Sequence, residues 1–318
     1  MKVGLDAFTI REVTTDPFGQ LKFAYQHGFD GVQFDEASYL GTDVGRLKDI
    51  VQYAEENGLY THASVDVINP VTQGQDSISK IAKEIAAYAQ VGWNELRTRT
   101  GGLDERGPQY RAGAVEAMKT LRPVLKEYHS RINFENHGEC TTFDLLRMIE
   151  EVGDDIMGIN LDTANTFVHA EDPLLAVKRT APYVHTTHAK DGILFFSKEG
   201  ITRQGRPAGS GIVEWEAILP ILYQHNKDLT LSIEDHKWLF EISIYNEQWM
   251  VDHPDLNPIE LAKLVQHSWN CSDQILKGII QDPYEYEKVS FADEMMERLN
   301  SARDYLKMMV KKLKAEEI

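Results

Sequence analysis

The chain has 318 residues, 42% of them apolar, which is enough to bury one large core or two ordinary ones. With 33 basic and 50 acidic residues, its formal net charge of −17 disfavours nucleic acid and anionic membranes as partners. The only cysteines are Cys140 and Cys271, and no CxxC pair occurs, so the sequence indicates neither a disulfide framework nor a thiolate zinc site.

The first ten residues, MKVGLDAFTI, lack the charged leader and apolar stretch of a secretion signal. No apolar run approaches the roughly 18 residues that a membrane-spanning helix needs. We therefore expect a soluble protein that is not exported. The low cysteine content is typical of a reducing cytoplasm, where we place the protein.

Short apolar runs that alternate with amphipathic stretches predict an α/β protein. Eight such runs read as strands, and their ranges are 3–8, 31–35, 59–65, 94–99, 132–135, 156–162, 184–189 and 229–234. Helical periodicity follows several of them, in ranges 16–28, 45–58, 76–92 and 110–130. Strand followed by helix, repeated eight times, predicts a (β/α)8 TIM barrel. An open doubly wound sheet is the alternative, but no GxGxxG motif follows the first strand.

The sequence contains no repeat, low-complexity segment or flexible linker, so we expect a single domain over residues 1–318. A barrel needs one closing helix after its eighth strand, and residues 292–317 have the period of that helix. The excess lies in residues 238–290, which we interpret as a helical insertion. Because aromatic residues are enriched at interfaces, Tyr245, Trp249 and Trp269 favour a subunit interface over a lid.

Four of the predicted strands end in residues that could bind a metal ion. Functional groups in such barrels project from the carboxyl ends of the strands, where Glu135, Asp162, His188 and Glu234 stand. Three carboxylates and one imidazole suit a divalent ion, with Mn²⁺ preferred over Mg²⁺, Co²⁺ or Fe²⁺, and Zn²⁺ less suited to oxygen ligands. The alternative is that each residue is a surface group or a helix cap.

Several motifs carry a resemblance to a known family: ENHG at 135–138, LDTAN at 161–165, HAKD at 188–191, GSGIVEW at 209–215 and SIED at 232–235. With HGFDGVQFD at 27–35, they resemble the sugar phosphate isomerase/epimerase superfamily. These xylose isomerase-like barrels include d-tagatose 3-epimerase and hydroxypyruvate isomerase. The resemblance covers residues 1–238 and the final helix.

The resemblance implies roles for individual residues. It implies that Glu135, Asp162, His188 and Glu234 are the metal ligands, and that Glu135 and Glu234 pass protons on opposite faces of a carbon next to a carbonyl. Epimerases of this group usually carry a histidine where this chain has Asn165. Their arginine before a Pro-Gly-rich loop is matched only loosely by RQGRPAGSG, so Arg203 and Arg206 are both eligible.

Further side chains near the strand ends are candidates for substrate binding or proton transfer. His137 and His236 each lie two residues beyond a glutamate, so each shares that glutamate's face if the strand continues and can act as an acid or base. A second-shell or solvent-facing histidine is the alternative. Hydroxyl-rich substrates need planar donors and acceptors, and the candidates for that role are Gln33, Asp35, His62, Arg97 and Arg99. The two arginines could instead pair with acidic groups lining the barrel.

Three enzyme activities fit this set of residues. The first is isomerisation or epimerisation of a ketose. The second is elimination from an oxidised sugar, as in the α-subunits of bacterial C-glycoside-deglycosylating enzymes, which are manganese-dependent, act on 3-oxo-C-glycosides and require a small β-subunit. The third, cleavage at abasic DNA sites, is disfavoured by the net charge of −17. A non-catalytic subunit that binds sugar or metal is the alternative from another class. As partners we expect a small-molecule sugar or glycoside, together with a homo-oligomer or the small β-subunit.

Overall fold

The computed structural model describes residues 1–35, 37–102 and 105–315. The chain divides into two compact units. The first comprises Met1–Leu161, Pro182–His188 and Asp228–Ser232, and the second comprises Asp162–Ala181, Ala189–Lys227 and the chain from Ile233 onward. Whether these units behave as one domain in solution stays a prediction.

The first unit is built on one sheet of eight parallel strands. They are β1 (Lys2–Asp6), β2 (Gly31–Gln33), β3 (Tyr60–His62), β4 (Glu95–Thr98), β5 (Arg131–Glu135), β6 (Met157–Asp162), β7 (Val184–Ala189) and β10 (Thr230–Ile233). Their order in the sheet is β3-β2-β1-β10-β7-β6-β5-β4, and a bridge between Ser64 and Arg97 connects the two edges. The predicted TIM-barrel fold is therefore confirmed.

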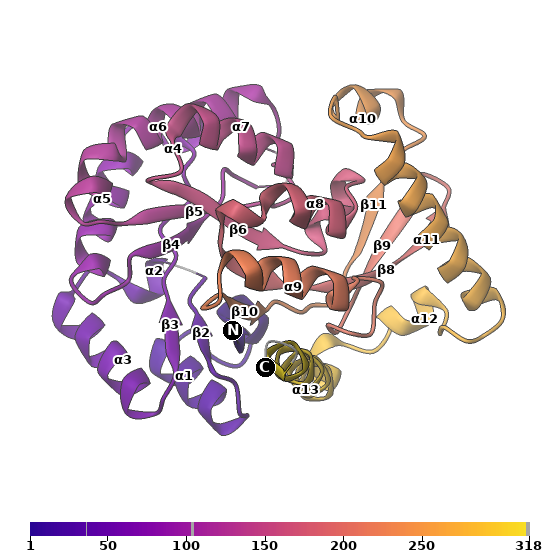
Figure 1. The fold of residues 1–318 in the computed structure, drawn as a ribbon, viewed down its shortest axis with the longest axis horizontal. Helices are drawn as coiled ribbons and strands as arrows, with labels where there is room; N and C mark the ends of the chain where they lie inside the picture. Colours follow the sequence, from indigo (N-terminus) through magenta and orange to yellow (C-terminus); the bar gives the residue numbers. More distant parts are fainter. Residues whose placement is uncertain (36, 103–104, 316–318) are drawn as a thin grey trace. The chain divides into compact units, whose positions relative to one another are not determined.

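Helices lie outside these strands (Figure 1), as the alternation of strand and helix predicts. All six residues of β6 are buried, which is typical of strands covered on both faces. The helices of the first unit are η1 (Ala7–Ile10), α1 (Pro17–Gln26), α2 (Ala37–Leu40), α3 (Val44–Glu56), α4 (Pro70–Gln73), α5 (Asp76–Ala89), α6 (Pro108–Glu127) and α7 (Thr142–Val152).

Short polar signals define where several of these helices begin and end. Asp16 and Asp43 accept backbone N–H groups at the starts of α1 and α3, and Thr141 forms a capping box with Asp144 at the start of α7. Gly28 follows α1 with a φ of 70°, a left-handed conformation that glycine adopts without steric cost. The boundaries of the predicted helices follow these signals.

The second unit contains a three-stranded antiparallel sheet that the sequence analysis missed. Its strands are β8 (Asp191–Ser197), β9 (Gly200–Arg206) and β11 (Leu239–Ile242), in the order β11-β9-β8. Ser197 pairs with Gly200, so two residues turn β8 into β9. Helix α11 (Pro258–Leu276) packs on β8 (Figure 1), and Cys271 lies in a cluster with Ile193 and Phe195.

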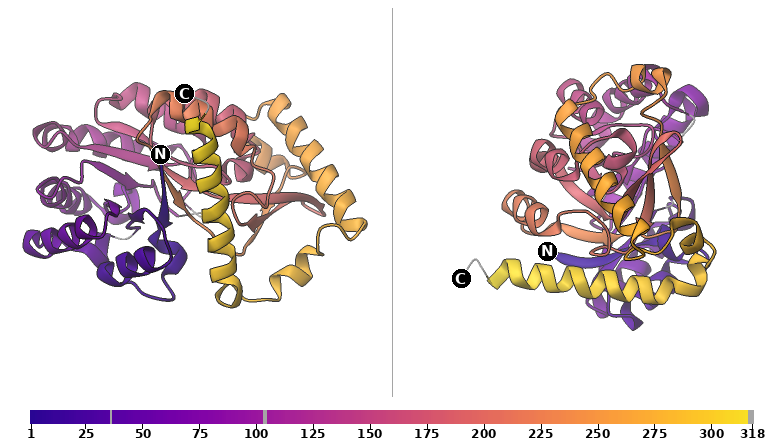
Figure 2. Two further views of the ribbon diagram at one scale, coloured as in Figure 1. Left: turned by 60° about the horizontal axis from the view of Figure 1, so that its bottom comes forward. Right: turned by 90° about the vertical axis from the view of Figure 1, so that its right-hand side faces the viewer.

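The remaining helices of the second unit are η2 (Asn165–His169), α8 (Pro173–Thr180), α9 (Trp215–His225), α10 (Glu247–Val251), α12 (Pro283–Glu287) and α13 (Phe291–Ala315), with η3 (Ala181–Tyr183) at the boundary. The long α13 is visible along its length in Figure 2 and packs on α9. The prediction of a helical insertion at residues 238–290 is only partly right, because the segment begins with β11, which pairs with β9.

A search of the described helices found none that is both long and apolar enough to cross a membrane.

Candidate metal centre

The four predicted metal ligands stand at the carboxyl ends of neighbouring strands. Glu135 ends β5, Asp162 ends β6, His188 is the penultimate residue of β7, and Glu234 directly follows β10. The sheet order β10-β7-β6-β5 makes these four strands neighbours. Each of the four is buried, and three carboxylates with one imidazole are side chains of the kind that could bind a divalent metal ion.

In the first unit, Glu135 is paired with Arg97. Both side chains are buried, and the guanidinium donates to Glu135 Oε2 through Nη2 and, at 3.1 Å, through Nε. Burial raises the pKa of Glu135, but the charges of Arg97 and His188 outweigh it and hold the pKa well below its usual value. Glu135 is therefore ionised at neutral pH. For Arg97, the structure thus shows the alternative stated above, in which the arginine pairs with an acidic group of the barrel instead of remaining available to a substrate.

His188 is oriented by two residues on neighbouring strands of the first unit. Its Nε2 lies 3.3 Å from Asp6 Oδ2 and 2.8 Å from the side-chain amide of Gln33. Its Nδ1 lies 3.4 Å from Glu135 Oε1. The amide nitrogen of Gln33 is thus at hydrogen-bond distance from Nε2, and the Asp6 carboxylate places a negative charge beside the ring. Asp6 was missed by the sequence analysis, because the predicted strand continued to residue 8, whereas β1 ends at Asp6.

In the second unit, the carboxylates of Asp162 and Glu234 share one buried lysine. Lys190 Nζ donates to Glu234 Oε1 at 2.7 Å and to Asp162 Oδ2 at 3.1 Å. Burial lowers the pKa of Lys190, but these two carboxylates outweigh it and raise the pKa above its usual value. Lys190 was also missed, although it lies inside the HAKD motif. The sequence gives no signal for this role, because the burial of Lys190 and its partners are seen only in the structure.

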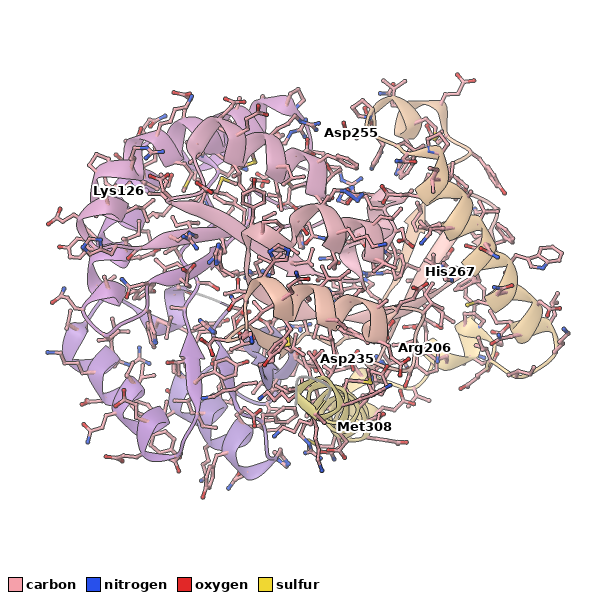
Figure 3. All side chains as sticks on the ribbon, viewed as in Figure 1. Lys126, Arg206, Asp235, Asp255, His267 and Met308 are labelled. Atoms are coloured by element: carbon pink, nitrogen blue, oxygen red, sulfur yellow. The ribbon has the colours of Figure 1, made fainter. Side chains whose placement is uncertain are left out.

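The two eligible arginines lie in different surroundings within the second unit. Arg203 is buried and donates to Asn165 Oδ1 at 3.2 Å. It therefore contacts Asn165, the residue at the position where the resemblance led us to expect a histidine. Arg206 instead stacks on Tyr286, with its guanidinium carbon 3.6 Å from the ring centroid. Arg298, which is paired with Asp235, also lies over this ring. Figure 3 labels Arg206 and Asp235.

The two predicted acid–base histidines both lie next to carboxylates. His137 Nδ1 is bound to Glu139 in the first unit. His236 Nε2 lies 3.5 Å from Glu234 Oε1 in the second unit. Burial and the nearby Lys190 charge lower the pKa of His236 to about 4, so this ring is neutral at neutral pH.

The remaining candidates for substrate binding lie in the first unit. Arg99 lines a polar cavity of about 30 Å³ together with Asp35 and Asp66. Among the described residues, Arg99 Nε has no hydrogen-bond partner. His62 lies deeper, with Nε2 3.2 Å from Thr230 Oγ1, and burial lowers its pKa to about 4. His62 is thus part of the packed interior, whereas Arg99 borders open space.

The fold and these residues define a (β/α)8 barrel with a candidate metal centre at its strand ends. A family model described as a xylose isomerase-like TIM barrel matches residues 21–250, so the chain belongs to that family. This confirms the superfamily that the motifs indicate. A comparison with curated protein sequences found no match.

Solved structures share the fold at low sequence identity. L-ribulose 3-epimerase is 15% identical with a TM-score of 0.63, over 99% of this chain and 96% of that one. The 3-keto-D-glucoside 4-epimerase from E. coli is 17% identical with a TM-score of 0.57, over 84% and 99%. The IolI protein, solved with a zinc atom, is 18% identical with a TM-score of 0.58, over 83% and 99%.

Proposed function

We propose that the chain is a divalent-metal-dependent enzyme that removes a proton next to the carbonyl of a sugar or an oxidised sugar, and so isomerises or epimerises a ketose. The observation that carries this proposal is the buried set of Glu135, Asp162, His188 and Glu234 at neighbouring strand ends. The names of the similar structures, which include two sugar epimerases, support it.

The residues present fit a divalent ion. Burying three carboxylates is costly without compensating positive charge, and a divalent ion supplies such charge. Gln33 and Asp6 lie beside Nε2 of His188, so we assign Nδ1 as its ligand atom. We assign the ion as Mn²⁺, with Mg²⁺, Co²⁺ and Fe²⁺ as alternatives, because oxygen ligands dominate the set. When bound, such an ion stabilises the negative charge that develops on the substrate oxygen.

Proton transfer is assigned to Glu135 and Glu234. Arg97 keeps Glu135 ionised, so this carboxylate can accept a proton at neutral pH. Glu234 accepts a hydrogen bond from Lys190, and we assign it the return of a proton to the substrate. His137, held by Glu139, is a third candidate for acid–base work.

Substrate recognition is assigned to polar side chains around these groups: Gln33, Arg99, Asn165, Arg203 and His236. His62 fits this role less well, because its ring lies in the packed interior beside Thr230. Arg99 lines a small polar cavity, and in the part of the chain that the structure describes its Nε has no hydrogen-bond partner, so this nitrogen can donate to a hydroxyl group. Arg206 is the weakest candidate because its guanidinium is stacked on Tyr286. We further place the enzyme in the cytoplasm, since both cysteines are free, and we assign subunit contacts to the aromatic residues of the segment 238–290.

The decisive experiment is NMR in D₂O with Mn²⁺-loaded protein and a panel of free ketoses and 3-keto-glucosides. Deuterium entering the carbon next to the carbonyl supports the proposal, and a Glu135→Gln variant serves as the control because it lacks the base. Release of a free aglycone would instead identify a lyase. Metal binding without exchange or turnover of any compound would identify a non-catalytic binding subunit.

A further inference from the structure

Lys190 is a buried cation placed between two of the proposed metal ligands. Its ammonium lies 2.7 Å from Glu234 Oε1, 3.1 Å from Asp162 Oδ2 and 3.5 Å from Asn165 Oδ1. The backbone on both sides of its Cα is also held, because Lys190 N donates to Thr163 Oγ1 and this hydroxyl donates to Lys190 O. These two hydrogen bonds hold the backbone of Lys190 in place within the second unit.

The contacts of Asp162 show how much of its lone-pair capacity the protein already uses. Its Oδ1 accepts from the backbone N–H groups of Ala164 and Asn165, at 3.0 and 2.9 Å. Its Oδ2 accepts from Lys190. Arg203, another buried cation nearby, donates to Asn165 Oδ1 and to Ala164 O, whereas Lys190 donates to both carboxylates.

We propose that Lys190 is a counter-cation that stabilises Asp162 and Glu234 in the metal-free protein and that must withdraw when a divalent ion binds. This inference rests on the proposed function, because it takes both carboxylates as metal ligands. Two buried carboxylates repel each other without a cation. An ammonium and a divalent ion that contact the same two oxygens also repel each other, so they compete for one place.

Arg97 provides a contrast within the same protein. Its guanidinium donates to Oε2 of Glu135, whereas Oε1 of that carboxylate approaches His188 Nδ1. One oxygen is thus used by the counter-cation and the other faces a proposed ligand. Lys190 instead bridges two different carboxylates. Arg97 can therefore stay in place while Oε1 of Glu135 binds an ion. Both oxygens of Asp162 already accept hydrogen bonds, one from Lys190 and the other from backbone N–H groups, so an ion that binds Asp162 through Oδ2 takes the place of the lysine.

The test compares Lys190→Met with a matched variant, Lys237→Met. Lys237 is also buried in the second unit and pairs with Glu294 at 3.0 Å, away from the proposed ligands. Two quantities are measured for each protein: the Kd for Mn²⁺ by titration calorimetry, and the urea midpoint of the metal-free form. We expect Lys190→Met to bind Mn²⁺ about tenfold more tightly or better, with a lowered metal-free midpoint. Lys237→Met should lower the midpoint and leave the Kd unchanged.

A purely structural role for Lys190 makes the opposite prediction, since loosened ligands bind metal more weakly. Unchanged or weaker Mn²⁺ binding by a folded Lys190→Met protein would overturn the proposal. Lys190→Arg keeps the charge, so its Kd should stay near that of the parent protein. If the parent protein bound none of Mn²⁺, Mg²⁺, Co²⁺ and Zn²⁺, the metal-dependent function would fail. The counter-cation role would then be judged by the metal-free midpoint alone, and an unchanged midpoint would overturn it.

Discussion

The two units compensate their buried negative charges in different ways. In the first unit the buried carboxylate of Glu135 is paired with one cation, Arg97. In the second unit a single lysine contacts both Asp162 and Glu234. One cation paired with one carboxylate has no net charge. One cation shared by two carboxylates leaves a net negative charge, which a divalent ion can neutralise. The comparison separates residues that keep the site folded from residues that keep it ready to bind.

The largest effect should come from breaking the pair in the first unit. Arg97→Gln leaves Glu135 buried without its counter-charge, so we expect the free energy of unfolding to fall by about 3–5 kcal/mol. Urea denaturation of the metal-free protein measures this loss. The matched control is Arg122→Gln, because Arg122 makes a similar pair with Asp155 in an exposed position and should lose about 1 kcal/mol or less. Equal losses in the two variants would contradict the distinction between buried and exposed pairs.

The neutral histidines of the first unit should make its stability depend on pH. Burial lowers the pKa of His62 to about 4, and burial together with Arg131 lowers that of His185 to about 4. Because the folded pKa lies below the unfolded value of about 6.5, the stabilisation is complete above that pH and is lost as the pH falls towards 4. For each histidine, we expect the free energy of unfolding to fall by about 2 kcal/mol when the pH is lowered from about 7.5 to about 5.

His62→Gln isolates one of these contributions. The variant keeps a polar side chain but has no proton to gain, so its urea midpoint should fall less steeply between the two pH values than that of the parent protein. We compare how steeply the urea midpoint changes with pH in the two proteins. The carboxylates are the same in both, so their contribution cancels in the difference. Parallel slopes would show that His62 does not resist protonation in the folded state.

Asp6→Asn tests whether the partner of His188 acts on metal binding rather than on folding. An amide still fits the space but removes the negative charge beside the imidazole ring, so we expect Mn²⁺ affinity to fall by about 10–100-fold. Asp43→Asn is the control, since Asp43 caps α3 and should leave the affinity unchanged. An unchanged Kd in Asp6→Asn would remove Asp6 from the metal centre.

The barrel and its strand-end residues were predictable because local signals and topology agree there. Parallel strands must be apolar, each is followed by a helix, and their carboxyl ends meet at one edge. The predicted range of β7, 184–189, matches the structure without change. Asp6 and Lys190 were missed for different reasons. Asp6 ends the first strand but carries no motif, and a lysine near predicted ligands is unremarkable until its partners are known.

The antiparallel sheet of the second unit was missed because its strands do not follow the alternation of strand and helix on which the prediction relied. Only Lys190 separates β7 from β8, so the apolar run of β8 reads as a loop after a completed strand. β11 follows the eighth barrel strand closely, where a helix was expected. Arg203 and Arg206 consequently lie on a strand, β9, instead of in a loop, and their separate surroundings follow from the three-residue spacing, which directs them to opposite faces of the sheet.

The smallest expected effect on stability belongs to the outer face of α11, which the sequence assigns to a subunit interface. Trp269 is 67% exposed, so Trp269→Ser should change the free energy of unfolding by less than about 0.5 kcal/mol. Leu264 on the same helix is fully buried, and Leu264→Ala should cost about 2–5 kcal/mol. If the outer face joins two copies, sedimentation velocity will show a lighter species for Trp269→Ser alone at unchanged stability. An identical sedimentation profile would remove Trp269 from any interface between copies and leave α11 as a helix that only covers β8.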